Sequence, residues 1–257
     1  MRGVRLEVRD LSKFFGGLSA VSHLDLDIFD SEILGVIGPN GAGKTTLFNV
    51  ISGFYSPSRG KVVFDGHDIT GLKAHQVAQA GISRTFQISN LFMSLSALSN
   101  VFTCHHMSYR TGMWKRFLHT SSAIEEEERL RQSALEILEF MGLDDLKNEP
   151  AGKLTHGQQK ALSICMALAT NPKLLLLDEP VTGMNPAEIQ TILNLISRIR
   201  SRGMTIAIVE HNMQAVMNLC DRIIVLNHGQ KIAEGLHKEI IENQEVIEAY
   251  LGKEEEE

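Results

Sequence analysis

The chain has 257 residues, of which 43% are hydrophobic and 22% charged, a composition that suits one globular domain with a sizeable core. Its formal net charge of −6 lacks the basic excess of a general nucleic-acid-binding protein, so nucleic acid is not expected among its partners. The longest apolar runs have the length of a strand, so no transmembrane helix is predicted, and any work at a membrane is expected to go through a partner.

The first 32 residues are predicted to be rich in β-structure. Residues 4–8 alternate between apolar and charged side chains, which indicates a strand and not a signal peptide. The same alternation returns at residues 24–28. We therefore expect an antiparallel β region at the N-terminus.

Residues 33–87 are predicted to continue into an α/β core. Residues 33–37 form a continuous apolar run, which is typical of a buried strand. A glycine-rich loop follows this strand, and a helix is expected from about residue 44 to residue 52. Residues 61–64 are predicted to form another strand, which ends in the turn Asp65-Gly66.

Residues 88–168 change character and are predicted to form a helical insertion. Apolar side chains at Leu130, Ala134, Leu138 and Met141 fall on one face of a helix, together with Leu135. The four glutamates at 125–128 are expected to be a solvated acidic start, which suits the N-terminus of a helix.

Residues 169–235 are predicted to return to alternating strands and helices, which indicates an α/β domain with a mainly parallel sheet. We expect one domain over residues 1–257, with its core in 1–87 and 169–235, the insertion in 88–168 and a tail in 236–257. The four glutamates that end the tail are expected to be disordered. The elements expected in this last part of the core are strand 174–177, helix 186–202, strand 205–209, helix 213–220 and strand 223–226.

The glycine-rich loop matches GxxxxGK[ST], the phosphate-binding P-loop. Glycines let successive backbone N–H groups point at one anion, and the helix that follows adds its positive dipole end. Because an apolar strand precedes the loop and a helix follows it, an accidental glycine-rich turn is disfavoured. The nucleotide-binding residues expected here are Gly38, Pro39, Asn40, Gly41, Ala42, Gly43, Lys44, Thr45 and Thr46.

Two adjacent acids, Asp178 and Glu179, follow the apolar run 174–177. Buried parallel strands deliver site residues at their carboxyl ends, so the pair is expected beside the P-loop. Asp178 is expected to hold Mg²⁺ together with the Thr45 hydroxyl, and Glu179 is expected to polarise the attacking water. The alternative is a solvated acidic pair at the end of a strand.

Five further features, taken in chain order, resemble the ATPases of the ABC family. Phe15 resembles the aromatic residue that stacks on adenine, Gln87 the Q-loop glutamine, and His211 the switch histidine. Residues 180–185 resemble the D-loop region. The family's LSGGQ signature is resembled by Leu154, Thr155, His156, Gly157 and Gln158.

The resemblance covers essentially the whole chain and implies an ABC-type P-loop ATPase that uses ATP and Mg²⁺. It implies catalytic roles for Lys44, Glu179, His211 and Gln87, with Gln87 also among the metal ligands. Taken alone, His211 and Gln87 could be ordinary structural residues, and the neighbouring Phe14 leaves open which ring is part of the core. In the family, the signature of one subunit closes over the γ-phosphate held by the P-loop of another.

Two residues depart from the family pattern in the elements that complete the partner's site. His156 stands at the first glycine of the signature, and Asn185 replaces the acid of the D-loop. The first is tolerated only where the backbone does not need a glycine-only conformation, and the second keeps hydrogen bonding without charge. We therefore expect a pair of unlike ATPase subunits, since a homodimer would impose both changes on both sites.

Within the family, the chain is similar to the ATPase subunit of branched-chain amino acid importers. The segments that carry this likeness are 81–87, 156–160, 183–186, 209–213 and 246–252. It implies two permease subunits, an extracytoplasmic solute-binding protein and a place at the cytoplasmic face of the membrane. The alternatives are an importer of urea or other small polar solutes, a soluble ABC ATPase without a transport role, and a nucleotide-sensing subunit that does not hydrolyse ATP.

Two other features bear on where the chain works. The cysteines Cys104, Cys165 and Cys220 lie far apart without a CxxC or zinc spacing, so reduced thiols of a cytosolic protein are expected. Residues 105–119 mix three basic side chains with Tyr109, Trp114 and Phe117. This stretch could touch lipid headgroups or a membrane partner, although a solvated insert with a hydrophobic underside is favoured.

Overall fold

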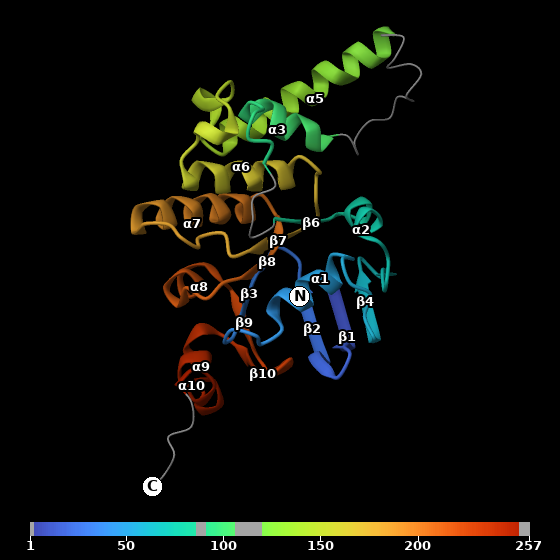
Figure 1. Cartoon of the computed structure of the whole chain (residues 1–257), viewed down its shortest axis with the longest axis vertical. Coiled ribbons are helices and arrows are strands. Elements are labelled where there is room, and N and C mark those ends of the chain that lie inside the picture. The colour runs from blue at the N-terminus through green and yellow to red at the C-terminus, as the bar shows by residue number, and fades with distance from the viewer. Residues whose placement is uncertain (1–2, 86–90, 106–119, 252–257) are drawn as a thin grey trace.

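The computed structural model describes residues 3–85, 91–105 and 120–251. The N-terminal strands form an antiparallel sheet in the order β2-β1-β4-β5 (Figure 1). The two long strands, β1 and β2, have twelve residues each and extend well beyond the alternating stretches 4–8 and 24–28. Their pairing contains register shifts, and Asp10 and His23 have positive φ angles, so the alternation of apolar and polar residues breaks along each strand. The strands are β1 (Val4–Phe15), β2 (Leu18–Phe29), β4 (Arg59–Phe64) and β5 (His67–Asp68).

The second sheet has six strands in the order β10-β9-β3-β8-β7-β6. Its inner neighbours pair in parallel, and β10 pairs antiparallel with β9 at one edge. The phosphate-binding loop leaves the carboxyl end of β3, and the two acids stand at the carboxyl end of β7. The strands are β3 (Ile33–Ile37), β6 (Ile82–Arg84), β7 (Leu174–Asp178), β8 (Thr205–Val209), β9 (Arg222–Asn227) and β10 (Gln230–Gly235).

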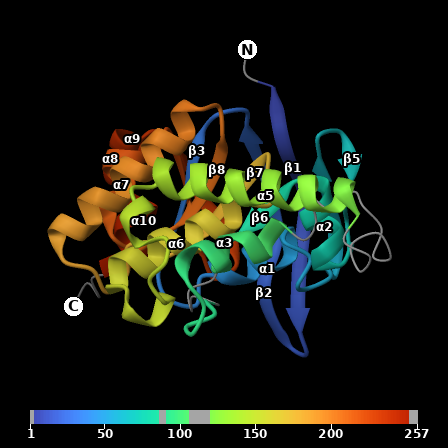
Figure 2. The same cartoon turned by 90° about the horizontal axis from the view of Figure 1, so that it is seen from above.

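Helices cover the parallel sheet and build a separate layer above it (Figures 1 and 2). The upper layer consists of α3 (Ala97–Cys104), α5 (Ser121–Phe140) and α6 (His156–Leu168), with short 3₁₀ turns at Asp144–Leu146 and Ala151–Lys153 between α5 and α6. Between this layer and the sheet lies α7 (Pro186–Ser201). The remaining helices are α1 (Lys44–Ile51), α2 (Ala74–Ala80), α8 (Met213–Leu219), α9 (His237–Ile241) and α10 (Gln244–Leu251).

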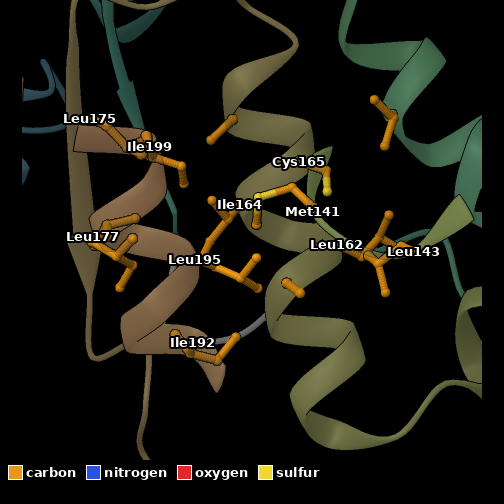
Figure 3. Packing of buried hydrophobic residues seen from close by; sticks show 14 of the residues in the cluster. Met141, Leu143, Leu162, Ile164, Cys165, Leu175, Leu177, Ile192, Leu195 and Ile199 are labelled. Atoms are coloured by element: carbon orange, nitrogen blue, oxygen red, sulfur yellow. The ribbon is translucent and has the colours of Figure 1, made fainter. Parts of the chain in front are cut away.

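The apolar run of β7 is continuous because both faces of this strand are buried. Leu175 and Leu177 belong to the core shared with α6 and α7, whereas Leu174 and Leu176 belong to the core shared with β1, β2 and α1. Figure 3 shows the first of these cores, with Leu195 and Ile199 of α7 placed between β7 and Ile164 of α6. Core side chains therefore pack against both faces of β7, the strand that ends at Asp178.

The α/β fold class with a mainly parallel sheet, an antiparallel N-terminal region and inserted helices is confirmed. Strands β3 and β8 have the predicted bounds. The expectation of a solvated acidic start at 125–128 was wrong in two respects. Helix α5 begins at Ser121 and has no acidic residue in its first turn. Glu126 is buried, and its Oε1 atom lies 3.6 Å from Nη2 of Arg129. Of the predicted tail, residues 237–251 contain α9 and α10, which bury Ile240 and Val246 against β9.

Some expectations fall outside the described part of the chain. Gln87, residues 106–119 of the basic and aromatic stretch, and the terminal glutamates are among them. Within the described ranges, no helix is both long and apolar enough to cross a membrane. The three cysteines are free thiols.

Candidate functional site

The loop between β3 and α1 has a backbone that requires glycine at two positions. Gly38 has a φ of 147°, and a Cβ atom there would lie 2.1 Å from the carbonyl oxygen of Leu226. Gly43 has a φ of 102°, and its Cβ atom would lie 2.4 Å from the carbonyl oxygen of Ala20. The neighbouring backbone therefore approaches the loop more closely than any side chain would allow, and α1 begins directly after Gly43.

Lys44, the first residue of α1, is folded back onto the loop. Its Nζ atom donates hydrogen bonds to the carbonyl oxygens of Gly38 (2.6 Å) and Pro39 (3.0 Å). Burial lowers the pKa of Lys44 from its ordinary value of 10.5, and the carboxylates of Glu179 and Asp178 oppose that shift. The ammonium group is therefore placed by the loop itself and lies within electrostatic reach of both acids.

A cavity of about 380 Å³ lies over the loop and the start of α1. Its lining includes Glu179 and the aromatic ring of Phe15, at the end of β1. Phe15 packs edge to face against Tyr55, with ring centroids 5.2 Å apart. The residues predicted for nucleotide binding that line this cavity are Asn40, Gly41, Ala42, Gly43, Lys44, Thr45 and Thr46, together with Phe15.

Asp178, the last residue of β7, is buried and tied to the strand and helix beside it. Its Oδ2 atom lies 2.7 Å from Nη2 of Arg84, and its backbone N–H donates to the hydroxyl of Thr85. Arg84 also donates to Asn49 of α1 at 2.7 Å and to Ser52, the C-cap residue of that helix, at 3.2 Å. The buried guanidinium thus connects the carboxylate to the helix that follows the P-loop, an arrangement for which the sequence offered no signal.

Glu179 occupies a strained turn at the edge of the cavity. Its φ of 48° lies in the left-handed region, which a residue with a Cβ atom seldom adopts without other constraints. Its backbone N–H donates to the carbonyl oxygen of Val209, and its Oε2 atom accepts from the hydroxyl of Thr182. Its Oε1 atom lies 3.7 Å from Nδ1 of His211, so the structure brings these two predicted residues face to face.

The signature residues lie at the N-terminus of α6, with Thr155 as the N-cap and His156, Gly157 and Gln158 in the first turn. None of them is among the described residues that line the P-loop cavity. Thr155 caps the helix, since its hydroxyl accepts from the N–H of Gln158, whose side chain accepts from the N–H of Thr155 in return. His156 is exposed at the first position of α6, and its φ is not positive. The backbone there needs no glycine, so histidine fits without strain.

Asn185, the other departure from the family pattern, caps α7. Its Oδ1 atom accepts hydrogen bonds of 3.0 Å from the N–H groups of Ala187 and Glu188. An aspartate would cap the helix in the same way, so the exchange removes a charge and keeps the local structure. Both departures therefore alter what the chain presents outward, without disturbing its own fold.

Four polar residues near the site were not assigned to it from sequence. Lys160 of α6 is buried with Nζ 3.5 Å from the carbonyl oxygen of Glu179, and burial lowers its pKa. Glu210 is buried directly before His211, and His228 lines the cavity over the P-loop. Burial raises the pKa of Tyr250 in α10, and a hydrogen bond from the backbone of Gly38 opposes that shift. No sequence motif marks these four residues, and only their position in the structure places them near the site.

Replacing Phe15 with alanine is expected to weaken ATP binding about tenfold, because stacking on a nucleobase contributes roughly 1–3 kcal/mol. Phe14 offers a matched control, since its exposure (38%) is close to that of Phe15 (43%) but it is not among the described residues that line the cavity. Equilibrium titration with a fluorescent ATP analogue measures both variants. Equal losses in Phe14→Ala and Phe15→Ala would count against base stacking by Phe15.

Known protein families and individual proteins match this chain over most of its length. A family model described as ABC transporter matches residues 21–182, and one described as branched-chain amino acid ATP-binding cassette transporter matches residues 230–256. The chain is 39% identical over 249 residues to the high-affinity branched-chain amino acid transport ATP-binding proteins BraF of Pseudomonas aeruginosa and LivG of Escherichia coli. Each alignment covers 96% of this chain and 98% of the relative.

Solved structures give the same result for the fold. A nucleotide-free ATP-binding cassette from an ABC transporter superposes with a TM-score of 0.85 at 32% identity, covering 97% of this chain and 100% of the other. An ATP-binding cassette in its ADP conformation superposes with a TM-score of 0.85 at 33% identity, covering 97% and 99%.

Proposed function

This chain belongs to the ATP-binding subunits of the ABC transporter family, and we propose that the transporter it powers imports branched-chain amino acids. The observation that carries the solute class is the match of residues 230–256 to a family model specific to branched-chain amino acid cassettes. The likeness to BraF and LivG over almost the whole chain supports the same assignment. Urea and other small polar solutes remain the competing cargo.

The P-loop cavity is proposed to bind the triphosphate of ATP. Backbone N–H groups at the start of α1 and the ammonium of Lys44 would contact the phosphates, and Phe15 would contact the base. The oxygen donors of Thr45 and Asp178 suit Mg²⁺, a hard cation that prefers hydroxyl and carboxylate ligands, with Gln87 as a further ligand in the proposal. When bound, Mg²⁺ would neutralise phosphate charge.

Glu179 is proposed to act on the attacking water in hydrolysis, and His211 on the γ-phosphate. Glu179 would orient the attacking water and accept its proton, because its carboxylate lines the cavity beside the P-loop. His211, 3.7 Å from that carboxylate, would contact the γ-phosphate. Lys44 would offset the charge that develops on the leaving phosphates. The groups proposed for water attack and for proton transfer therefore lie at the same edge of the cavity.

A second ATPase subunit is proposed to complete the site. The signature residues are not among the described residues that line this chain's own cavity. They lie at the capped N-terminus of α6, where Thr155 and His156 are exposed. His156, at the start of α6, and Asn185, at the start of α7, are both exposed, and Gly183 lies beside His156. An unlike partner would bring its own signature to the ATP held here and confine the two departures to the other site.

The isolated chain is therefore expected to bind Mg-ATP and to turn it over slowly. Adding the partner ATPase and the permease should raise turnover at least about tenfold, as residues supplied in trans do in other phosphoryl-transfer systems. Steady-state ATPase activity, measured against protein concentration alone and with the partners in lipid, tests this. High activity of the chain alone, second order in its own concentration and unchanged by partners, contradicts the heterodimer.

Two permease subunits and an extracytoplasmic solute-binding protein are proposed as further partners, which would hold the chain at the cytoplasmic face of the membrane. A groove of about 410 Å³ between α3 and α5 supports a docking role for the helical layer. Its described lining combines Leu98, Phe102 and Ile124 with six polar or charged residues, and Phe92 and Met93 are exposed in the segment before α3. Apolar side chains in such positions suit a partner surface.

The solute class is tested by purifying the chain with its partners from the native membrane and adding solutes to the assembly in lipid. Leucine, isoleucine or valine, presented with the binding protein, should accelerate ATP turnover. Stimulation by urea or a short amide alone would overturn the branched-chain assignment and leave the ATPase assignment intact. Co-purification with ribosomes and no permease would favour a non-transport ATPase.

A further inference from the structure

The carboxylate of Glu210 is among the most deeply buried charged groups of the described chain, with 1% of the residue exposed. It stands between the end of β8 and His211. A buried carboxylate is costly unless several donors satisfy its oxygens, so its partners indicate why it is there.

Three backbone N–H groups from two different segments donate to this carboxylate. Oε1 accepts from Val181 at 3.0 Å, and Oε2 accepts from His211 at 3.1 Å and Asn212 at 3.3 Å. Burial raises the pKa of Glu210, and these N–H groups oppose that shift, with the charge of His211 adding to their effect. One side chain therefore joins the segment after β7 to the segment after β8.

The two segments are those that carry Glu179 and His211. Val181 follows Glu179 by two residues, so the strained turn at Glu179 is fixed on both sides. The N–H of Glu179 bonds to the carbonyl oxygen of Val209 before it, and the N–H of Val181 bonds to Glu210 after it. Because the same carboxylate also holds the N–H of His211, it sets the two turns relative to each other.

We propose that Glu210 is a positioning residue for ATP hydrolysis, which fixes the carboxylate of Glu179 and the imidazole of His211 at their working separation. The proposal rests on the roles proposed above for those two residues. Glu210 is not among the described residues that line the nucleotide cavity. It acts through three backbone hydrogen bonds, which are charge-assisted and therefore among the strong ones.

Glutamine at position 210 separates this role from simple packing. Its size is nearly that of glutamate, but its amide nitrogen donates and cannot accept, so one of the two segments loses its acceptor. Glu32 provides the matched control, because it is also buried (3% exposed) and accepts from the backbone N–H of Phe29 and from Arg222. It is not among the described residues lining the nucleotide cavity.

Amide hydrogen exchange of the full chain gives the first measurement. In Glu210→Gln, exchange at Val181 or at His211 and Asn212 should quicken by about tenfold or more, while Phe29 keeps its protection. Glu32→Gln should leave Val181, His211 and Asn212 protected, because the hydrogen bonds of the Glu32 carboxylate go to Phe29 and Arg222. Unchanged protection at all three amides in Glu210→Gln overturns the proposal, whether or not Glu179 is the catalytic carboxylate.

Turnover by the assembled transporter gives the second measurement. Glu210→Gln should lower kcat about tenfold while the Kd for Mg-ATP stays within about twofold of wild type, because positioning acts on the reaction and not on phosphate binding. Glu32→Gln, compared per folded molecule, should keep the wild-type kcat. A kcat for Glu210→Gln equal to that of Glu32→Gln, or a parallel loss of ATP affinity, would overturn the positioning role.

Discussion

Exchanging Glu179 for glutamine is expected to slow ATP hydrolysis by about 10²–10⁴-fold while ATP stays bound, because the amide cannot accept a proton from the attacking water. The exchange is nearly isosteric, and the amide oxygen can still accept the hydrogen bond from Thr182. The phosphate-binding loop and Lys44 are left in place. Single-turnover hydrolysis and equilibrium ATP binding, measured on the assembled transporter, separate the two effects.

Glu239→Gln provides a control for the loss of one carboxylate, since Glu239 bonds the N–H of Leu236 at the start of α9 and is not among the described residues lining the nucleotide cavity. Its hydrolysis rate should match wild type. If Glu179→Gln hydrolyses ATP as fast as wild type, Glu179 is not the catalytic carboxylate.

Replacing Lys44 with alanine is expected to abolish tight ATP binding, with an affinity loss of at least about 10²-fold. The ammonium is the point charge proposed to contact the phosphates, and such charge-assisted bonds are about twice as strong as neutral ones. In the described structure this group also bonds to Gly38 and Pro39, so its loss frees two carbonyl oxygens of the loop. Calorimetric titration with Mg-ATP measures the loss.

Lys173→Ala provides the control for loss of a lysine, because Lys173 is exposed and pairs with Asp65 at 2.7 Å outside the cavity. Its ATP affinity should be unchanged. Thermal unfolding of both variants without nucleotide shows whether the loop change alters the fold. An affinity of Lys44→Ala close to wild type contradicts the P-loop assignment.

The sequence by itself determined the elements whose cause is local. A run of apolar residues is buried on both faces in any parallel sheet, so β3 and β8 were predicted with their observed bounds. The P-loop is equally local, because positive φ angles at glycine and the start of a helix define it within eight residues. The order of these elements along the chain was then sufficient to predict the fold class and to group the phosphate and carboxylate residues.

Only the tertiary structure decided how the acids and their neighbours are held. Arg84 reaches Asp178 across 94 residues of sequence, and Glu210 reaches Val181 across 29. The register shifts of β1 and the burial of α9 and α10 likewise depend on which surface packs against them. The physical reason is that a buried polar group or apolar face must be satisfied by whatever the fold brings near it, and no local pattern records those partners.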